Sequence, residues 1–182
     1  MRRLVFLSAI LVSIFSVNLA QAGNKPWGYI LDASKRFVVL PEFYDQAVLD
    51  RTTGLIWTKA PRDVAVDWPS AFEICLANAV GAVANGRGGI AGWRLPEAEE
   101  LLSLTEFHIR CSSGNCGNSY DLPEGHPFDF QPAAGSDIFW SATLSHEKTF
   151  SDEDGSFVVN INGLGPVNAP RTEEFNVWCV RG

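Results

Sequence analysis

Three short stretches that each contain a tryptophan constrain the fold of this chain more than any other feature of its sequence. They are VLDRTTGLIW (48–57), GWRLPEAEELLSL (92–104) and VWCVRG (177–182). Each joins a large aromatic side chain to turn-forming or helix-starting residues, which is typical of a compact packing unit. Because the stretches are spread over most of the sequence, they indicate one domain rather than several.

The first 22 residues have the pattern of a secretory signal peptide. Arg2 and Arg3 precede an apolar run over 4–17, and residues 20–22 (AQA) form a small-residue cleavage site. The run is shorter than the roughly 20 apolar residues that a membrane-spanning helix needs. We therefore expect cleavage after Ala22, export to the periplasm or the extracellular space, and no membrane insertion of the mature chain.

The mature chain is strongly acidic. Its net charge changes from −7 to −9 when the leader is removed, because residues 1–22 hold two arginines and no acidic residue. The remaining lysines and arginines are scattered singly along the sequence. Such a surface is a poor match for nucleic acid or anionic lipid, so we expect neither as a partner.

Four cysteines indicate a disulfide framework. An even number of cysteines in an exported chain is typical of paired thiols. Cys111 and Cys116 flank the turn-forming residues SSGN and can close a small loop, which leaves Cys75 to pair with Cys179. In the chain-entropy model the long bridge stabilises the fold by about 4–5 kcal/mol and the short one by about 2 kcal/mol.

Hydrophobic periodicity predicts two helices in the first half of the domain. Apolar residues over 68–79 recur at helical spacing and turn Cys75 inward, and Asp67 is a suitable N-cap. A second helix is predicted to start at Pro96. The acidic residues of its first turn match the helix dipole and are interpreted as solvated rather than catalytic (Glu97, Glu99 and Glu100).

Strands are predicted before and after these helices. Residues 37–40 read as an edge strand and 48–57 as a hairpin, and further strands are expected over 139–143, 157–161 and 175–180. Two segments are expected to be irregular: the long insert 107–137, of a length that is often functional, and a loop bracketed by Pro166 and Pro170. Helices that precede an antiparallel sheet favour an α+β domain.

Four motifs in this order resemble the Lcl C-terminal domain family, a domain of unknown function (1566): TGLIW (53–57), GWRLP (92–96), FWSAT (139–143) and WCVRG (178–182). The resemblance covers residues 48–182 and leaves 23–47 as an N-terminal extension. It implies a C-type-lectin-like α+β domain with two helices packed on a curled antiparallel sheet and two disulfides. It also implies an exported module of the adhesin type that contacts glycans.

Catalysis is not expected. The motif WRLPEAEE (93–100) is similar to a sequence found in the formylglycine-generating enzymes, whose chemistry needs reactive cysteines. Here, however, Cys75 and Cys179 are better explained as a structural bridge. Only Arg110 stands beside the 111/116 pair to favour a thiolate. Ser141 lies on a predicted strand rather than in a G-x-S-x-G elbow. No catalytic residue and no cofactor are therefore predicted, and a formylglycine-generating-like enzyme is the least favoured alternative.

Two sets of residues are weak metal candidates. Asp152, Glu153 and Asp154 precede Gly155, but a D-x-D-G stretch without the rest of a calcium loop is more often an acidic turn. A zinc set is conceivable from two histidines and two cysteines, but its spacing fits no common signature (His108, Cys111, Cys116 and His126). The calcium motifs of sugar-binding lectin-like domains do not occur in the sequence. We expect no metal.

Most tryptophans are predicted to be core residues, because they fall inside predicted elements or motifs. These are Trp57, Trp68, Trp93, Trp140 and Trp178, whereas Trp27 is expected to be exposed. Arg94 stands between two apolar residues, so its guanidinium is predicted to be a structural clamp that carbonyls or a carboxylate satisfy.

The sequence thus predicts an exported, non-catalytic recognition module of the adhesion type. Its partner is expected to be an extracellular glycan or an envelope protein, contacted through the insert 107–137 or the loop 144–155, because loops on a rigid sheet often carry recognition. The alternative is a structural or envelope-assembly protein with no small ligand.

Overall fold

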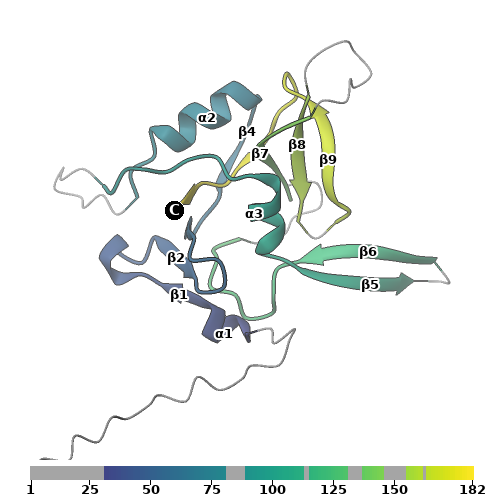
Figure 1. Cartoon of the computed structure of the whole chain (residues 1–182), viewed down its shortest axis with the longest axis horizontal. Helices are drawn as coiled ribbons and strands as arrows, with labels where there is room; N and C mark the ends of the chain where they lie inside the picture. The colour runs from purple at the N-terminus through teal and green to yellow at the C-terminus, as the bar shows by residue number, and fades with distance from the viewer. Residues whose placement is uncertain (1–30, 81–88, 113–114, 131–136, 146–154, 162) are drawn as a thin grey trace, which may run out of the picture. The chain divides into compact units, whose positions relative to one another are not determined.

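The structure is a computed structural model of the chain. It describes residues 31–80, 89–112, 115–130, 137–145, 155–161 and 163–182, and residues 31–182 form one compact unit. Figure 1 shows this unit as short strands arranged around a central helix. None of the helices in the described part of the chain is long and apolar enough to cross a bilayer.

The described residues form short helices and mostly short strands. The helices are α1 (Ala33–Arg36), the 3-10 helix η1 (Pro41–Phe43), α2 (Trp68–Leu76) and α3 (Ala98–Ser103). The strands are β1 (Phe37–Val39), β2 (Ala47–Asp50), β3 (Ile56–Thr58), β4 (Arg62–Val66), β5 (Glu106–Ser112), β6 (Asn115–Asp121), β7 (Ile138–Ser145), β8 (Gly155–Asn160), β9 (Gly165–Pro170), β10 (Phe175–Val177) and β11 (Val180–Arg181).

The first sheet contains four antiparallel strands in the order β1-β2-β3-β11. The predicted hairpin over 48–57 is present as β2 and β3, and Gly54 adopts a φ of 78° in its turn, which is a conformation that favours glycine. Residues 37–39 form the expected edge strand. Pro41, which was expected to end it, opens η1 after one intervening residue.

The second sheet contains five strands in the order β4-β10-β7-β8-β9. Its pairings are antiparallel except that of β10 with β7, which is parallel through Asn176 and Phe139. β10 and β11 are separated by only Trp178 and Cys179 but belong to different sheets. These two residues therefore lie where the chain crosses from one sheet to the other.

The prediction of a C-type-lectin-like α+β domain, with two helices packed on one curled antiparallel sheet, is wrong. Strands hold 43% and helices 18% of the described residues, and the strands form three sheets. The periodic stretch over 68–79 forms a helix only to Leu76, whose side chain is 67% exposed. Of the two predicted disulfides, the Cys75–Cys179 bridge is present among the described side chains.

Two segments that were predicted to be irregular form strands instead. Residues 106–112 and 115–121 form the antiparallel pair β5–β6, and residues 165–170 form the edge strand β9, which contains Pro166 and Pro170. Proline is compatible with an edge strand, because its missing N–H can face away from the neighbouring strand. β4 was not predicted at all.

The core consists of two clusters of buried side chains. The first is aromatic and centres on Trp178, whose ring lies 5.1 Å from Phe128 and 5.3 Å from Phe139. The second surrounds Trp93, Trp140 and the disulfide. Phe37 and Phe43 add to the first and the second cluster respectively, so residues 31–47 pack as part of the folded unit.

Main-chain hydrogen bonds connect the motifs that were singled out in the sequence. Arg94 and Val180 exchange both of their backbone bonds, at 2.8 and 3.0 Å, and the N–H of Ala142 donates to the carbonyl of Pro96 at 2.7 Å. The N–H of Ala98 donates to Oγ1 of Thr143, at the start of α3. The motifs therefore join both large sheets to α3, which explains their order and composition.

Arg94 forms the clamp that the sequence predicted. Its two Nη atoms donate to the two carboxylate oxygens of Glu100 at 2.7 Å each, and Nη1 also reaches the carbonyl of Leu95. Glu100 additionally accepts from the N–H of Glu97 at 2.8 Å. The acidic first turn of α3 is thus tied to the segment that precedes the helix, and Glu100 is not simply solvated as was predicted.

Replacing Arg94 with lysine should lower the melting temperature by about 3–6 °C. A lysine cannot reproduce the bidentate geometry, and a charge-assisted pair of this kind is worth about 1–2 kcal/mol. Thermal unfolding followed by circular dichroism measures the change. An unchanged melting temperature would show that the clamp does not stabilise the fold.

The difference in melting temperature between the unchanged chain and the Arg94→Lys variant should become smaller in acid. Hydrogen bonds from Arg94 hold the pKa of the Glu100 carboxyl below its usual range. Since that pKa is lower in the folded chain than in the unfolded chain, the contribution is complete above the ordinary value of about 4.3. It is lost as the pH falls through the folded-state pKa, so the melting temperatures of both proteins should converge as the solution is acidified further.

Candidate functional site

A groove of about 340 Å³ lies beside the Cys75–Cys179 disulfide. Its polar lining comes from four parts of the chain: the segment before β2, the turn from β3 to β4, the residues after α2, and the segment after β6. Its charged and amide side chains are Asp45, Gln46, Lys59, Arg62, Asn78 and Asp129. The groove thus combines amides, carboxylates and cations that are distant in sequence.

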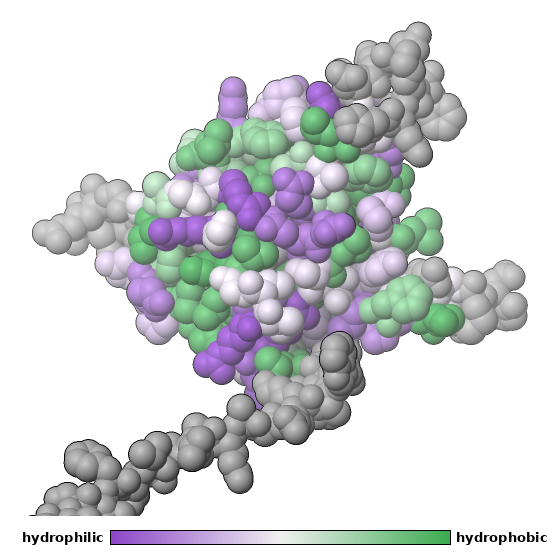
Figure 2. Space-filling view, in the orientation of Figure 1, coloured by the Kyte–Doolittle hydropathy of each residue, from purple (hydrophilic) through white to green (hydrophobic). Residues whose placement is uncertain are grey.

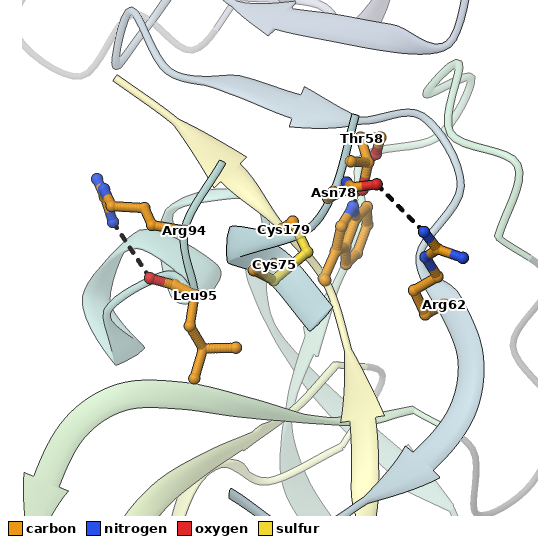
Figure 3. Close-up of a disulfide and its surroundings, with 8 residues drawn as sticks. Thr58, Arg62, Cys75, Asn78, Arg94, Leu95 and Cys179 are labelled. Atoms are coloured by element: carbon orange, nitrogen blue, oxygen red, sulfur yellow. Dashed lines mark hydrogen bonds between the residues drawn. A yellow bond between two sulfur atoms is a disulfide. The ribbon is translucent and has the colours of Figure 1, made fainter. Parts of the chain in front are cut away.

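The disulfide anchors the floor of this groove. Cys75 lies near the end of α2 and Cys179 between β10 and β11, with 104 residues of separation and 5.4 Å between the Cα atoms. This is the predicted long-range pairing. Figure 3 shows Thr58, Arg62 and Asn78 on one side of the bridge, with Arg94 and Leu95 on the other. For the second predicted pair, the strand register places Cys111 opposite Cys116, and their side chains lie outside the described set.

Asn78 and Arg62 form one wall. Nη2 of Arg62 donates to Oδ1 of Asn78 at 3.2 Å, and the backbone N–H of Asn78 donates to the carbonyl of Cys75 at 3.1 Å. Asn78 is 7% exposed, whereas Arg62 is exposed. The amide is therefore fixed by the disulfide-bearing turn and orients a cation at the edge of the groove (Figure 3).

Lys59 and Asp129 form the opposite edge. Nζ of Lys59 lies 3.2 Å from Oδ2 of Asp129, and the N–H of Asp129 donates to the carbonyl of Lys59 at 2.9 Å. The N–H of Lys59 in turn donates to the carbonyl of Gln46. The Asp129 side chain is 65% exposed, so this ion pair is open to solvent and available to a ligand.

Tyr44 and Asp45 hold an uncommon backbone conformation next to this edge. Their φ angles are 53° and 59°, in the left-handed region that favours glycine. Such angles cost about 1 kcal/mol or more per residue and persist where the surrounding structure holds them. Backbone bonds to Pro41 and Leu40 do so here. The Tyr44 side chain is 57% exposed.

A second cavity, of about 400 Å³, borders Arg62, Val64, Ile74 and Ala77. It lies against β4 and the outer side of α2. Arg62 lines both cavities.

The model of the Lcl C-terminal domain matches residues 46–181. The chain belongs to the Lcl C-terminal domain family. The match includes Gln46, Lys59, Arg62, Asn78 and Asp129, so the groove is built almost entirely within the Lcl domain. No curated protein and no solved structure matches the chain.

The tryptophans of the Lcl motifs are core residues. Trp57, Trp93, Trp140 and Trp178 are at most 1% exposed. The indole N–H groups of three of them donate to backbone carbonyls at 2.7–2.8 Å. Trp93 donates to Ile90, Trp140 to Val66, and Trp178 to Thr58. Trp57 and Trp178 pack edge to face at 5.9 Å. These rings therefore stabilise the Lcl domain and offer no face to a ligand.

Other candidates do not gather at one site. Asp152, Glu153, Asp154 and Trp27 lie outside the described residues. Within the described part of the chain, no cluster of three or more histidine, cysteine, aspartate or glutamate side chains could hold a metal ion. Nδ1 of His126 accepts from the N–H of Phe128, and burial lowers the pKa of His126.

Ser141 is fully buried, and its Oγ donates to the carbonyl of Phe157 at 2.7 Å. This hydroxyl is therefore committed to the sheet interior.

Sequence reasoning missed the groove. Its residues carry no motif of their own, and the expected binding segments were 107–137 and 144–155. The first of these contributes Asp129, while residues 131–136 and 146–154 lie outside the described set. One signal was present: Lys59 lies two residues after the TGLIW motif and Asn78 three residues after Cys75, so polar residues stand close to this motif and to the disulfide.

Proposed function

We propose that this Lcl domain is an exported, non-catalytic recognition module that binds a glycan in the groove beside the disulfide. The observation that carries the proposal is the mixed polar lining of the groove, held on strands and turns that a disulfide and core tryptophans fix in place. Concave sites with a few convergent polar groups are typical of small-ligand binding.

The chemistry of the groove suits sugar hydroxyls. Hydroxyl groups both donate and accept, so they need carboxylate and amide oxygens beside N–H donors. Asp129 and Asp45 supply acceptors, Lys59 and Arg62 supply donors, and Asn78 supplies both. The acidic chain disfavours a polyanion, so a neutral glycan is the preferred ligand.

Absence of catalysis is supported by the groove's side-chain types. Its described lining contains neither histidine nor serine, and its cysteine is held in the disulfide. The Ser–His and Cys–His pairs that are common in nucleophilic catalysis therefore do not occur among those residues. Export is supported by the leader pattern over 1–22 and by a disulfide, which persists in oxidising compartments.

A glycan array probed with purified residues 23–182, with and without EDTA, tests the proposal. Binding should occur in both conditions, because no metal is expected at the groove. Mass spectrometry of the chain recovered outside the cytoplasm should show Gly23 as the first residue. Absence of glycan binding together with a stable partner in a crosslinked pull-down would support an envelope-assembly protein instead.

Substituting the exposed edge of the groove should weaken glycan binding. Lys59→Gln replaces a charged donor with a neutral, shorter amide and removes the ion pair with Asp129, so the Kd should rise about tenfold, as expected for loss of one charged hydrogen bond. Lys35→Gln is the matched control, because Lys35 forms a comparable exposed pair with Asp32 on α1. Equal effects of both substitutions on titration calorimetry would exclude the groove as the binding site.

A further inference from the structure

The hairpin β5–β6 carries exposed apolar side chains away from the two large sheets. It forms a sheet of its own and projects from the body of the unit in Figure 1. Phe107 is 53% exposed and Ile109 is 67% exposed, and both lie on one face of β5 because they are two residues apart. Figure 2 shows apolar surface on this projection.

The backbone of β5 points hydrogen-bonding groups outward at these same residues. The N–H of Tyr120 donates to the carbonyl of Gly163 at 3.1 Å, so the backbone of Tyr120 faces away from β5. Tyr120 is the register partner of Phe107. In an antiparallel ladder this makes them a non-hydrogen-bonded pair. The N–H and C=O groups of Phe107 and Ile109 therefore point to the outer edge of β5.

That outer edge is unprotected. Within the described residues β5 pairs only with β6, and the strand is regular over seven residues with no proline and no register shift. β9 differs, because Pro166 and Pro170 interrupt its row of donors. A long, regular edge with apolar side chains is a template for another strand.

We propose that β5 pairs with β5 of a second copy of this chain, antiparallel and about a two-fold axis at His108. In this register Phe107 of one copy lies opposite Ile109 of the other. Both residues present their backbone groups outward, so the two can exchange both N–H···O=C bonds. The symmetry repeats the pair on the other side of the axis.

The side chains of β5 are self-complementary in this register. Phe107 and Ile109 of both copies meet on one face and extend the contact that Phe107 already makes with Tyr120, at 5.4 Å between ring centroids. In the same register, Glu106 of one copy lies opposite Arg110 of the other, so residues of opposite charge are paired. The two His108 residues meet at the axis, each 3.7 Å from its own Glu106.

The alternative register centred on Ile109 lacks this match. It would place His108 opposite Arg110, a pairing of basic residues, and it would leave Glu106 opposite Ser112. Opposite charges across strands stabilise a pair and like charges destabilise it. The sequence of β5 therefore favours the register centred on His108 over the one centred on Ile109.

Sedimentation equilibrium of the purified chain, over about 1–500 µM, tests the proposal, since an interface this small gives weak association. The expected result is a reversible dimer. Ile109→Lys should raise its Kd at least about tenfold, because the charge falls in the apolar contact twice per dimer. Leu76→Lys is the matched control, because Leu76 is also 67% exposed but lies on α2.

A charge exchange separates the dimer from a folding defect. Glu106→Arg alone should weaken the dimer, and Glu106→Arg combined with Arg110→Glu should restore it to within about threefold of the original Kd, because the opposite pairing is rebuilt. A monomer at every concentration, equal effects of Ile109→Lys and Leu76→Lys, or failure of the double exchange to restore association would overturn the proposal.

Discussion

Replacing Cys75 and Cys179 together with alanine should lower the free energy of unfolding by about 4–5 kcal/mol. The bridge spans 104 residues, and in the chain-entropy model a loop of this length removes that much conformational freedom from the unfolded chain. Both cysteines are at most 1% exposed, so the substitution also leaves a small cavity in the second core cluster. Urea unfolding followed by tryptophan fluorescence measures the loss.

A second cysteine pair supplies the comparison. If the bridge that the sequence predicts between Cys111 and Cys116 forms, replacing both with serine should cost only about 2 kcal/mol, because the loop between them is short. Glycan binding in the groove should weaken more in the 75/179 variant, since Asn78 is anchored to the carbonyl of Cys75. If the two double variants unfold at the same urea concentration, loop length does not set the contribution of the bridge.

Asp50→Ala should cost about 3–5 kcal/mol, the usual loss when one partner of a buried ion pair is removed. Nε and Nη2 of Arg36 donate to the two oxygens of Asp50 at 3.0 and 2.7 Å, and the side chains are 7% and 0% exposed. Nη2 also donates to the carbonyl of Ser103, and Asp50 accepts from the N–H of Thr52. Without the carboxylate, Arg36 would remain charged in the interior.

The double variant Arg36→Met with Asp50→Leu should regain most of that loss. Apolar side chains of similar size can replace a buried ion pair at little cost, because no uncompensated charge remains. The exposed pair of Lys35 with Asp32 gives the control, and Asp32→Ala should change stability very little. Urea unfolding decides the question: a double variant as unstable as Asp50→Ala would mean that the charges themselves are required.

The sequence identified the elements whose stability depends on local signals. Asp67 caps α2 by accepting from the N–H of Ser70, and Gly54 makes the β2–β3 turn, as the residue types predicted. Tryptophans within motifs were assigned correctly to the core. Arg94 was recognised because an arginine between apolar neighbours needs partners, although Glu100 was not foreseen as that partner.

Strand pairings and side-chain contacts between distant segments could not be predicted from local signals. β4 and β9 lack a clear apolar alternation, and β9 contains two prolines, so both were missed. The pairing of Arg36 with Asp50 joins residues with no pattern between them. The groove depends on four such distant segments, which explains why no single stretch indicated it. The α+β prediction failed because it assigned a single sheet to strands that divide between two.

The crossing of the chain at Trp178 and Cys179 imposes an order on biosynthesis. Residues 175–181 supply the neighbours of β3, β4 and β7, and Val180 also pairs with Arg94. Until this stretch has left the ribosome, the first sheet lacks its edge strand β11, and the second lacks the strand that joins β4 to β7. Both large sheets are therefore completed only after residue 181 has been synthesised.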